Sequence, residues 1–175
     1  MADSERALRR DEALRILDEG HTSIGRRLRA LPAGRLDEPG IGGGDWTPKD
    51  LAGHLATWDK AGLDTIEDAQ AGRSVRINEA LAREGLDGFN DAEVQRKASL
   101  TGPEALAELE RVHRALVEAI GRLSDEAWAA PVPHLEPRRS LGSMLGGVLG
   151  APGHPFMHPF AHLADLDDSP LGEPD

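Results

Sequence analysis

The stretch WTPKDLAGHLATW, at residues 46–58, decides how this chain folds. Thr47 is a favourable N-cap because its hydroxyl can accept a hydrogen bond from a free backbone N–H, and Pro48 is a favourable first helical residue because it has no N–H to leave unpaired. A helix is therefore predicted to begin here. Leu51 and Leu55 follow at helical spacing, so one side of this helix faces a core.

His54 lies in the same apolar stripe, three residues after Leu51 and four before Trp58. Side chains at these spacings share one face of a helix, so the imidazole points into the protein and Trp58 is expected to line the same pocket. Two interpretations follow. His54 is either a neutral core histidine satisfied by one hydrogen bond or a metal ligand.

A second histidine-rich stretch, HPFMHPFAH, places His154, His158 and His162 at successive spacings of four near the C-terminus. Residues four apart on a helix stack on one face, and two imidazoles can then reach one ion. This stretch favours the metal interpretation of His54.

Prolines interrupt this second stretch, and a proline inside a helix costs about 3 kcal/mol because it removes a hydrogen bond and clashes with the preceding turn. We therefore expect the chain to break over residues 151–155 and a new helix to start near His158, with Pro159 at its first position. Either His158 or His154 can supply a ligand in that arrangement.

The two stretches together resemble the DinB superfamily, in which W-[ST]-x-x-D-[LV]-x-x-H-[LI]-x-x-W opens a helix and H-x-x-x-H follows near the C-terminus. The superfamily contains bacillithiol and mycothiol transferases, the mycothiol-dependent maleylpyruvate isomerase N-terminal domain and ClbS/DfsB-like proteins. The resemblance implies that His54, His158 and His162 are the three metal ligands. It also implies that Asp165 stands where many relatives have a glutamine.

Three further segments carry helical patterns of apolar residues. The first covers residues 3–31. The third long helix follows Thr101, which with Glu104 forms a capping box, and the fourth is expected to begin near Ser140. The helix that begins at Thr47 should reach about residue 71, the length that a bundle needs.

No segment alternates apolar and polar residues as a strand does, so the prediction is an all-α protein: a four-helix bundle with DinB-like topology. A long crossover, residues 72–100, would connect helices two and three. The chain length fits one domain, expected over residues 1–166, and the acidic, proline-containing tail at 167–175 is expected to be disordered.

Four other side chains are candidates for a substrate pocket. His21 and His113 occupy core positions of the first and third helices, where a histidine is more often structural; the alternative is that they line the cavity around the metal. In the crossover, Phe89 and Asn90 could form a lid at the pocket mouth. The alternative for Phe89 is that it anchors the crossover on the bundle.

Composition excludes several classes of function. The net charge of −11, from 31 acidic and 20 basic residues, argues against binding to a nucleic-acid backbone. No apolar run is long enough for a membrane span or a signal peptide, so we expect a cytoplasmic protein. The chain has no cysteine, so any thiol in its chemistry must come from a cofactor.

Three neutral imidazoles leave open positions on a divalent ion, as in catalytic sites. Zinc, nickel or iron would accept these ligands, and Asp165 is a candidate general base or hydrogen-bond acceptor. We expect a metal-dependent enzyme that acts on a small molecule by hydrolysis, or by transfer or isomerisation with mycothiol or another low-molecular-weight thiol. The alternatives are a ClbS-like protein whose cavity binds a reactive metabolite without metal, and a catalytically silent interaction module, for example a homodimer.

Overall fold

The structure is a computed structural model that describes residues 8–167. The expected acidic tail lies outside the described residues except for its first residue. The helices are α1 Arg10–Ala30, α2 Pro48–Gln70, α3 Arg76–Arg96, α4 Gly102–Gly121, α5 Asp125–Ala129, α6 Leu141–Val148, α7 His158–Ala161 and α8 Leu163–Asp167, with two 3-10 turns, η1 Ala33–Asp37 and η2 Ile41–Gly43.

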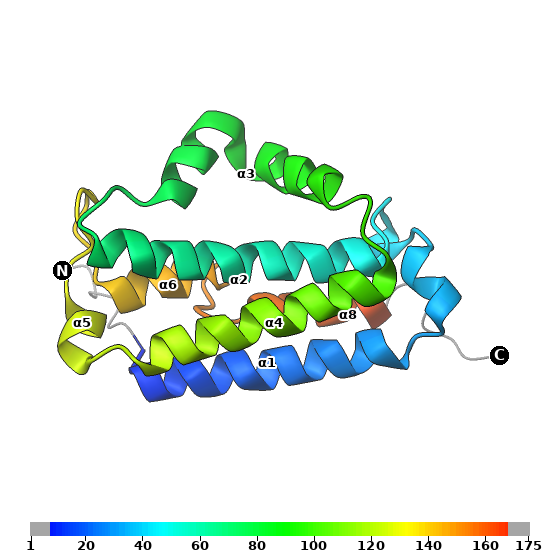
Figure 1. Ribbon diagram of the computed structural model, residues 1–175, viewed down its shortest axis with the longest axis horizontal. Helices are drawn as coiled ribbons and strands as arrows, with labels where there is room; N and C mark the ends of the chain where they lie inside the picture. Colours follow the sequence, from blue (N-terminus) through cyan, green and yellow to red (C-terminus); the bar gives the residue numbers. More distant parts are fainter. Residues whose placement is uncertain (1–7, 168–175) are drawn as a thin grey trace.

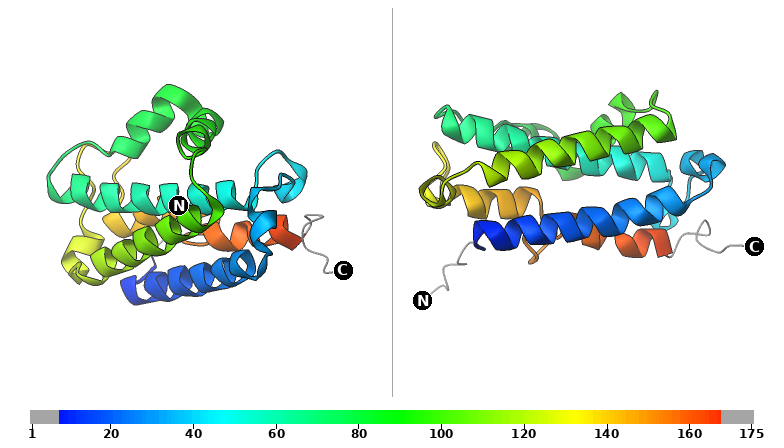
Figure 2. Two further views of the ribbon diagram at one scale, coloured as in Figure 1. Left: turned by 45° about the vertical axis from the view of Figure 1, so that its right-hand side comes forward. Right: turned by 60° about the horizontal axis from the view of Figure 1, so that its bottom comes forward.

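Three long helices and a broken fourth segment form the bundle (Figure 1). α2 packs against α4 and α6, and α1 packs against α4 and α7. The views in Figure 2 show α6 to α8 running beside the long helices as the fourth segment. The predicted all-α class is confirmed, and none of the helices in residues 8–167 is long and apolar enough to cross a membrane.

Helix α2 begins where the sequence predicted. The Thr47 hydroxyl accepts from the backbone N–H of Asp50 at 3.2 Å, and the Asp50 carboxylate accepts from the backbone N–H of Thr47 at 2.9 Å. This reciprocal capping box, with Pro48 as the first helical residue, fixes the N-terminus of the helix that carries His54. Thr101 and Glu104 form the same box at the start of α4.

Most of the crossover between the second and third long helices is itself helical and forms α3. α3 is bent at Gly85, which has φ 71° and ψ 170° and so breaks the helix into two arms that arch over α2 in Figure 1. Only Ile77 and Phe89 of α3 are buried. The apolar stripe that would have predicted this helix is therefore too sparse to detect.

The fourth segment breaks where its prolines predicted. After α6 the chain turns through reciprocal backbone hydrogen bonds between Ala151 and His154, and Phe156 is buried with φ 62°. α7 then starts at His158, with Pro159 as its second residue, rather than its first as expected. A proline in the first turn leaves no hydrogen bond unmade, so the short helix tolerates it.

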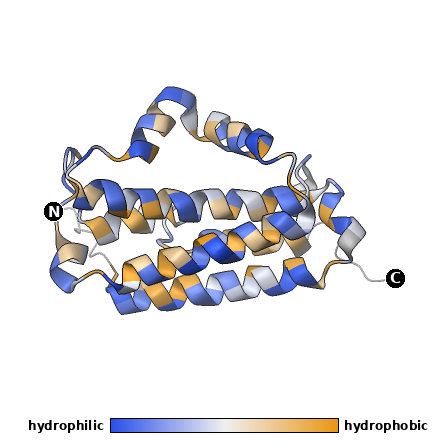
Figure 3. Cartoon of the chain, in the orientation of Figure 1, coloured by the Kyte–Doolittle hydropathy of each residue, from blue (hydrophilic) through white to orange (hydrophobic). Residues whose placement is uncertain are grey.

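The apolar core consists of two clusters. On α1, Leu17 belongs to one cluster and Ile24 to the other, with buried His21 between them in the sequence. On α4, buried His113 likewise lies between Leu116, which belongs to the same cluster as Leu17, and Leu109, which belongs to the same cluster as Ile24. Polar side chains therefore interrupt the core, although the long helices keep the mixed apolar and polar surfaces of amphipathic helices (Figure 3).

Gly142 on α6 lies against the indole of Trp128, and a Cβ atom at this position would be 2.4 Å from the ring. Trp128 is buried, and its Nε1–H donates to the backbone oxygen of Leu8 at 2.9 Å, so the ring has little room to move. We expect Gly142→Ala to lower the free energy of unfolding by about 1–3 kcal/mol through overpacking. Urea unfolding measures this change.

Gly121→Ala is the matched control, because a Cβ atom at the end of α4 meets nothing within 4 Å. It should leave the stability unchanged or raise it slightly, since alanine favours a helix over glycine. An unchanged unfolding midpoint in Gly142→Ala would contradict the close packing of α6 on Trp128.

Candidate metal centre

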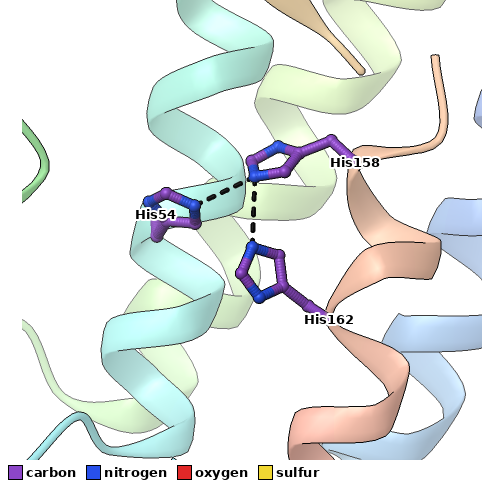
Figure 4. Close-up of side chains that lie close together, drawn as sticks. All are labelled: His54, His158 and His162. Atoms are coloured by element: carbon purple, nitrogen blue, oxygen red, sulfur yellow. Dashed lines mark hydrogen bonds between the residues drawn. The ribbon is translucent and has the colours of Figure 1, made fainter. Parts of the chain in front are cut away.

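Three histidines from α2 and α7 converge on one point (Figure 4). The Nε2 atom of His158 lies 3.0 Å from Nε2 of His54 and 3.2 Å from Nε2 of His162. These three residues form a group whose ligand atoms all lie within 4.8 Å of one another and could hold a metal ion. His54 and His158 thus lie side by side in space although they are 104 residues apart in the chain.

Burial keeps the imidazoles of His54 and His158 neutral. It lowers the pKa of His54 to about 2, with further lowering from the nearby His158 and His162. Burial likewise lowers the pKa of His158 to about 3, helped by His162. A neutral imidazole retains the lone pair that a metal requires, so the two side chains are ready to act as ligands at neutral pH.

The donor arrangement fits a divalent ion. Nδ1–H of His162 donates to Oδ2 of Asp165 at 2.6 Å, so its Nε2 carries the lone pair. Nitrogen atoms bound at about 2.0–2.1 Å in a tetrahedral zinc site lie roughly 3.3 Å apart, close to the Nε2 separations observed here. This hydrogen bond is of the kind with which a carboxylate orients a ligating histidine in many metal sites.

The backbone around the ligands is held by hydrogen bonds from other segments. Lys97 Nζ donates to the backbone oxygen of Gly53 at 2.9 Å, next to His54 on α2. The backbone N–H of His158 donates to the oxygen of Leu149 at 3.1 Å, which ties the start of α7 to the end of α6. These contacts tie the helix of His54 to the residue that follows α3, and the start of α7 to the end of α6.

His154 was the alternative to His158, and the structure places the two residues differently. His154 is exposed in the turn before α7, bridged to Ala151, and does not belong to the three-histidine group. It lines the neighbouring cavity instead.

A cavity of about 740 Å³ opens beside the three histidines. Its lining is mostly apolar and includes Trp46 and Trp58, whose rings lie 5.0 and 6.4 Å from the ring of His54. Four glycines of α6 and the turn after it are among the lining residues: Gly142, Gly146, Gly147 and Gly150. A cavity of this size and polarity suits a small-molecule ligand.

The predicted lid residues lie on α3 near this cavity but play different parts. Asn90 lines it, and its Oδ1 accepts from Trp58 Nε1–H at 3.1 Å, which links α3 to α2. Phe89 packs edge-on against Trp58, with ring centroids 5.6 Å apart, and lines a smaller cavity of about 390 Å³ between α2, α3 and α4. Its position agrees with the anchoring interpretation.

His21 and His113 are buried but are not among the residues that line the large cavity. Their rings stack on each other, with centroids 3.8 Å apart. Nδ1–H of His113 donates to Asp59 at 2.9 Å, and Nε2–H of His21 donates to Glu110 at 3.3 Å. The structure therefore brings these two predicted pocket residues to each other and not to the three-histidine centre.

Sequence reasoning did not identify several residues of these sites. Glu110 stands three residues before His113 on one helix, and this spacing was a usable signal. Asp59 lies on a different helix from both core histidines, so no spacing in the sequence connects it with them. Arg139 lines the large cavity from a loop, and no periodicity marks a loop residue.

Asp165→Asn should weaken metal binding by about 10- to 100-fold without unfolding the protein, because such partners of a ligating histidine set its orientation and basicity. The measurement is the zinc dissociation constant from competition with a chromophoric chelator. Asp18→Asn, which removes one negative charge from an exposed position on α1, is the control and should not change it. Equal affinities of the two variants would contradict the role given to Asp165.

Two solved structures share this fold, whereas a comparison with curated proteins finds no match. The colibactin self-resistance protein ClbS, solved in complex with double-stranded DNA, is similar with a TM-score of 0.70 and 15% identity, over 91% of this chain and 94% of that one. An uncharacterised protein from Escherichia coli UTI89 is similar with a TM-score of 0.72 and 18% identity, over 91% of each chain. At these identities the likeness shows the fold.

The family comparison covers most of the chain. Residues 17–149 match the mycothiol maleylpyruvate isomerase N-terminal domain, a range that includes His54 and ends before α7. Together with the bundle and its three-histidine group, this match confirms the DinB-like resemblance. The chain belongs to the family of the mycothiol maleylpyruvate isomerase N-terminal domain.

Proposed function

We propose that this protein is a metal-dependent enzyme that acts on a small molecule, by transfer or isomerisation with a low-molecular-weight thiol or by hydrolysis. One observation carries the proposal: three imidazoles gather their Nε2 atoms within hydrogen-bonding distance at the edge of a cavity of about 740 Å³. A structural metal site is closed by four protein ligands, whereas a catalytic one keeps a position open.

His54, His158 and His162 would hold a zinc, nickel or iron ion. Such an ion, when bound, acts as a Lewis acid that activates water or a thiol sulfur. The chain has no cysteine, so in the thiol reaction the sulfur belongs to a small molecule such as mycothiol. The family of the chain supports this choice of thiol.

The residues around the ligands would bind and orient the substrate. Trp46 and Trp58 supply apolar contact area. Asn90 also lines the cavity, and with its oxygen bonded to Trp58 its amide nitrogen would serve as the hydrogen-bond donor to substrate. Asp165 holds the proton at Nδ1 of His162 and so keeps the opposite nitrogen free. A general-base role for Asp165 is a further prediction, because its Oδ1 is not engaged by His162.

The test compares metal-loaded and metal-free protein in two assays. Untagged protein loaded with zinc, nickel or iron(II) is incubated with a low-molecular-weight thiol and an electrophile, and thiol consumption is followed; ester hydrolysis is measured in parallel. We expect activity in a loaded form, loss with chelator, and loss in His162→Ala but not in His154→Ala. Activity that chelator and His162→Ala leave unchanged would overturn the metal-dependent proposal.

The second candidate is a metabolite-binding or self-resistance function like that of ClbS, which the similar bundle and the large apolar cavity favour. In this case metal-free protein would bind or consume a small electrophile as well as the loaded protein does. ClbS was solved with DNA, but the net charge of −11 predicts that this chain does not bind a duplex. Fluorescence anisotropy with a labelled duplex at low salt tests that prediction, and a micromolar dissociation constant would contradict it.

A further inference from the structure

A second group of ligand-type side chains lies where the two apolar clusters meet. His21 on α1, Asp59 on α2 and His113 on α4 have exposed fractions of only 8, 7 and 6%. Glu110, one turn before His113 on α4, contacts His21 and also pairs with Arg29 of α1. Three buried polar residues from three different helices thus converge in the interior, and the partly exposed Glu110 lies at their edge.

The hydrogen bonds inside this group leave one buried atom unmatched. Asp59 accepts from Nδ1–H of His113 at 2.9 Å. Nε2 of His113, on the other side of the same ring, has no hydrogen-bond partner among the described residues and is shielded from solvent. A buried polar atom without a partner costs about 1–3 kcal/mol, so the arrangement is incomplete as it stands.

The two carboxylates of the group differ in exposure. The side chain of Glu110 is 39% exposed and pairs with Arg29, whereas Asp59 is buried. A cation placed between the two histidines and Asp59 would use the free lone pair of His113 and compensate the buried carboxylate.

We propose that His21, Asp59 and His113, with Glu110 as a fourth ligand, form a second divalent metal site in the bundle interior. The ligand atoms of the first three residues all lie within 4.8 Å of one another. Glu110 and His113 form a Glu-x-x-His pair, the spacing with which helical bundles present carboxylate and imidazole ligands to interior metals. Two nitrogen and two oxygen donors suit zinc, iron(II) or manganese(II).

Binding requires a small local rearrangement. The two imidazole planes are parallel to within 3°, whereas an ion bound to both rings must lie near the plane of each. Asp59 is bonded to Nδ1 of His113, on the opposite edge of the ring from the unpartnered Nε2, so both rings must rotate. His113 then gives up its bond to Asp59, and His21 its bond to Glu110, so that all four side chains can reach one ion. The site is closed off from the large cavity, so its ion would join α1, α2 and α4 and stabilise the fold rather than take part in the reaction.

The test counts metal ions after the first centre has been removed. The double variant His54→Ala/His162→Ala is loaded with zinc, passed through a desalting column and analysed by mass spectrometry for metal per chain. We expect one zinc per chain in the double variant and two in the wild type. Adding Asp59→Asn should remove the remaining zinc, whereas adding His134→Gln, at an exposed loop histidine, should not.

A second measurement guards against a variant that fails to fold. Cobalt(II) added to the folded double variant should produce the visible absorption of a protein-bound ion and raise the thermal midpoint. His21→Gln, which leaves the Asp59–His113 pair in place, should weaken this binding by at least 10-fold. A double variant that is folded by circular dichroism but binds neither zinc nor cobalt, or whose bound metal is unaffected by Asp59→Asn and His21→Gln, would overturn the proposal.

Discussion

Replacing His54 with alanine should remove one zinc ion per chain and lower the zinc affinity of this centre by more than about 100-fold. The reason is that even the loss of an outer hydrogen-bond partner of a ligand costs 10- to 100-fold, and His54 contributes a ligand nitrogen itself. His54 stands alone on α2, whereas His158 begins α7 and His162 directly follows it, so no neighbouring histidine can replace His54. His162→Ala should have the same effect.

The controls separate ligand loss from damage to the fold. His154→Ala removes an imidazole that lines the same cavity but lies outside the three-histidine group, so it should retain full zinc content. His54→Gln keeps a side chain of similar size in the buried position, so its circular dichroism should match the wild type while zinc binding at the three-histidine centre is lost. Wild-type affinity in folded His54→Gln would remove the basis for the metal centre.

The parts of the fold that could be predicted are those with strong local signals. The capping boxes at Thr47 and Thr101 each combine a side-chain acceptor, a proline and an acidic residue within four positions, and the helix starts follow directly. α3 was missed because it stands away from the bundle and buries only Ile77 and Phe89. A helix that covers little of the core leaves no stripe in the sequence.

The candidate site was predictable in part for a related reason. His158 and His162 sit one turn apart, so their proximity follows from local geometry, and the resemblance to a family added His54. The neighbours of His21 and His113 could not be predicted from the sequence. Both were expected on inner seams, but whether a seam faces the cavity or another helix depends on how α1, α2 and α4 rotate about their axes, which a single sequence does not reveal.

Acid should destabilise the metal-free protein as the pH falls below about 6.5, the pKa of histidine in an unfolded chain. In the folded protein the pKa of His54 is about 2 and that of His158 about 3, so between these values and 6.5 only the unfolded chain binds the protons. The free energy of unfolding then decreases by about 1.4 kcal/mol for each unit that the pH falls, for each of these two histidines. At pH 4.5, two units below 6.5, the protonation of His54 in the unfolded chain alone lowers the free energy of unfolding by roughly 2.7 kcal/mol.

Urea unfolding in the presence of chelator at pH 7.5, 5.5 and 4.5 measures this dependence. His54→Asn lacks the titrating group. Its free energy of unfolding should therefore fall less steeply as the pH decreases, with a slope about 1.4 kcal/mol per pH unit smaller than that of the wild type. His134→Gln removes an exposed histidine and should keep the wild-type slope. Identical slopes in all three proteins would show that His54 is protonated as readily in the folded as in the unfolded state.

The same titration links the stability of the fold to the proposed function. Burial beside His158 and His162 makes protonation of His54 costly, and the cost keeps its nitrogen lone pair available at neutral pH. A bound ion and a proton compete for that lone pair, so metal should stabilise the protein most near neutral pH and progressively less in acid. If zinc raised the thermal midpoint equally at pH 7.5 and 4.5, the ion would be bound by groups other than these three histidines.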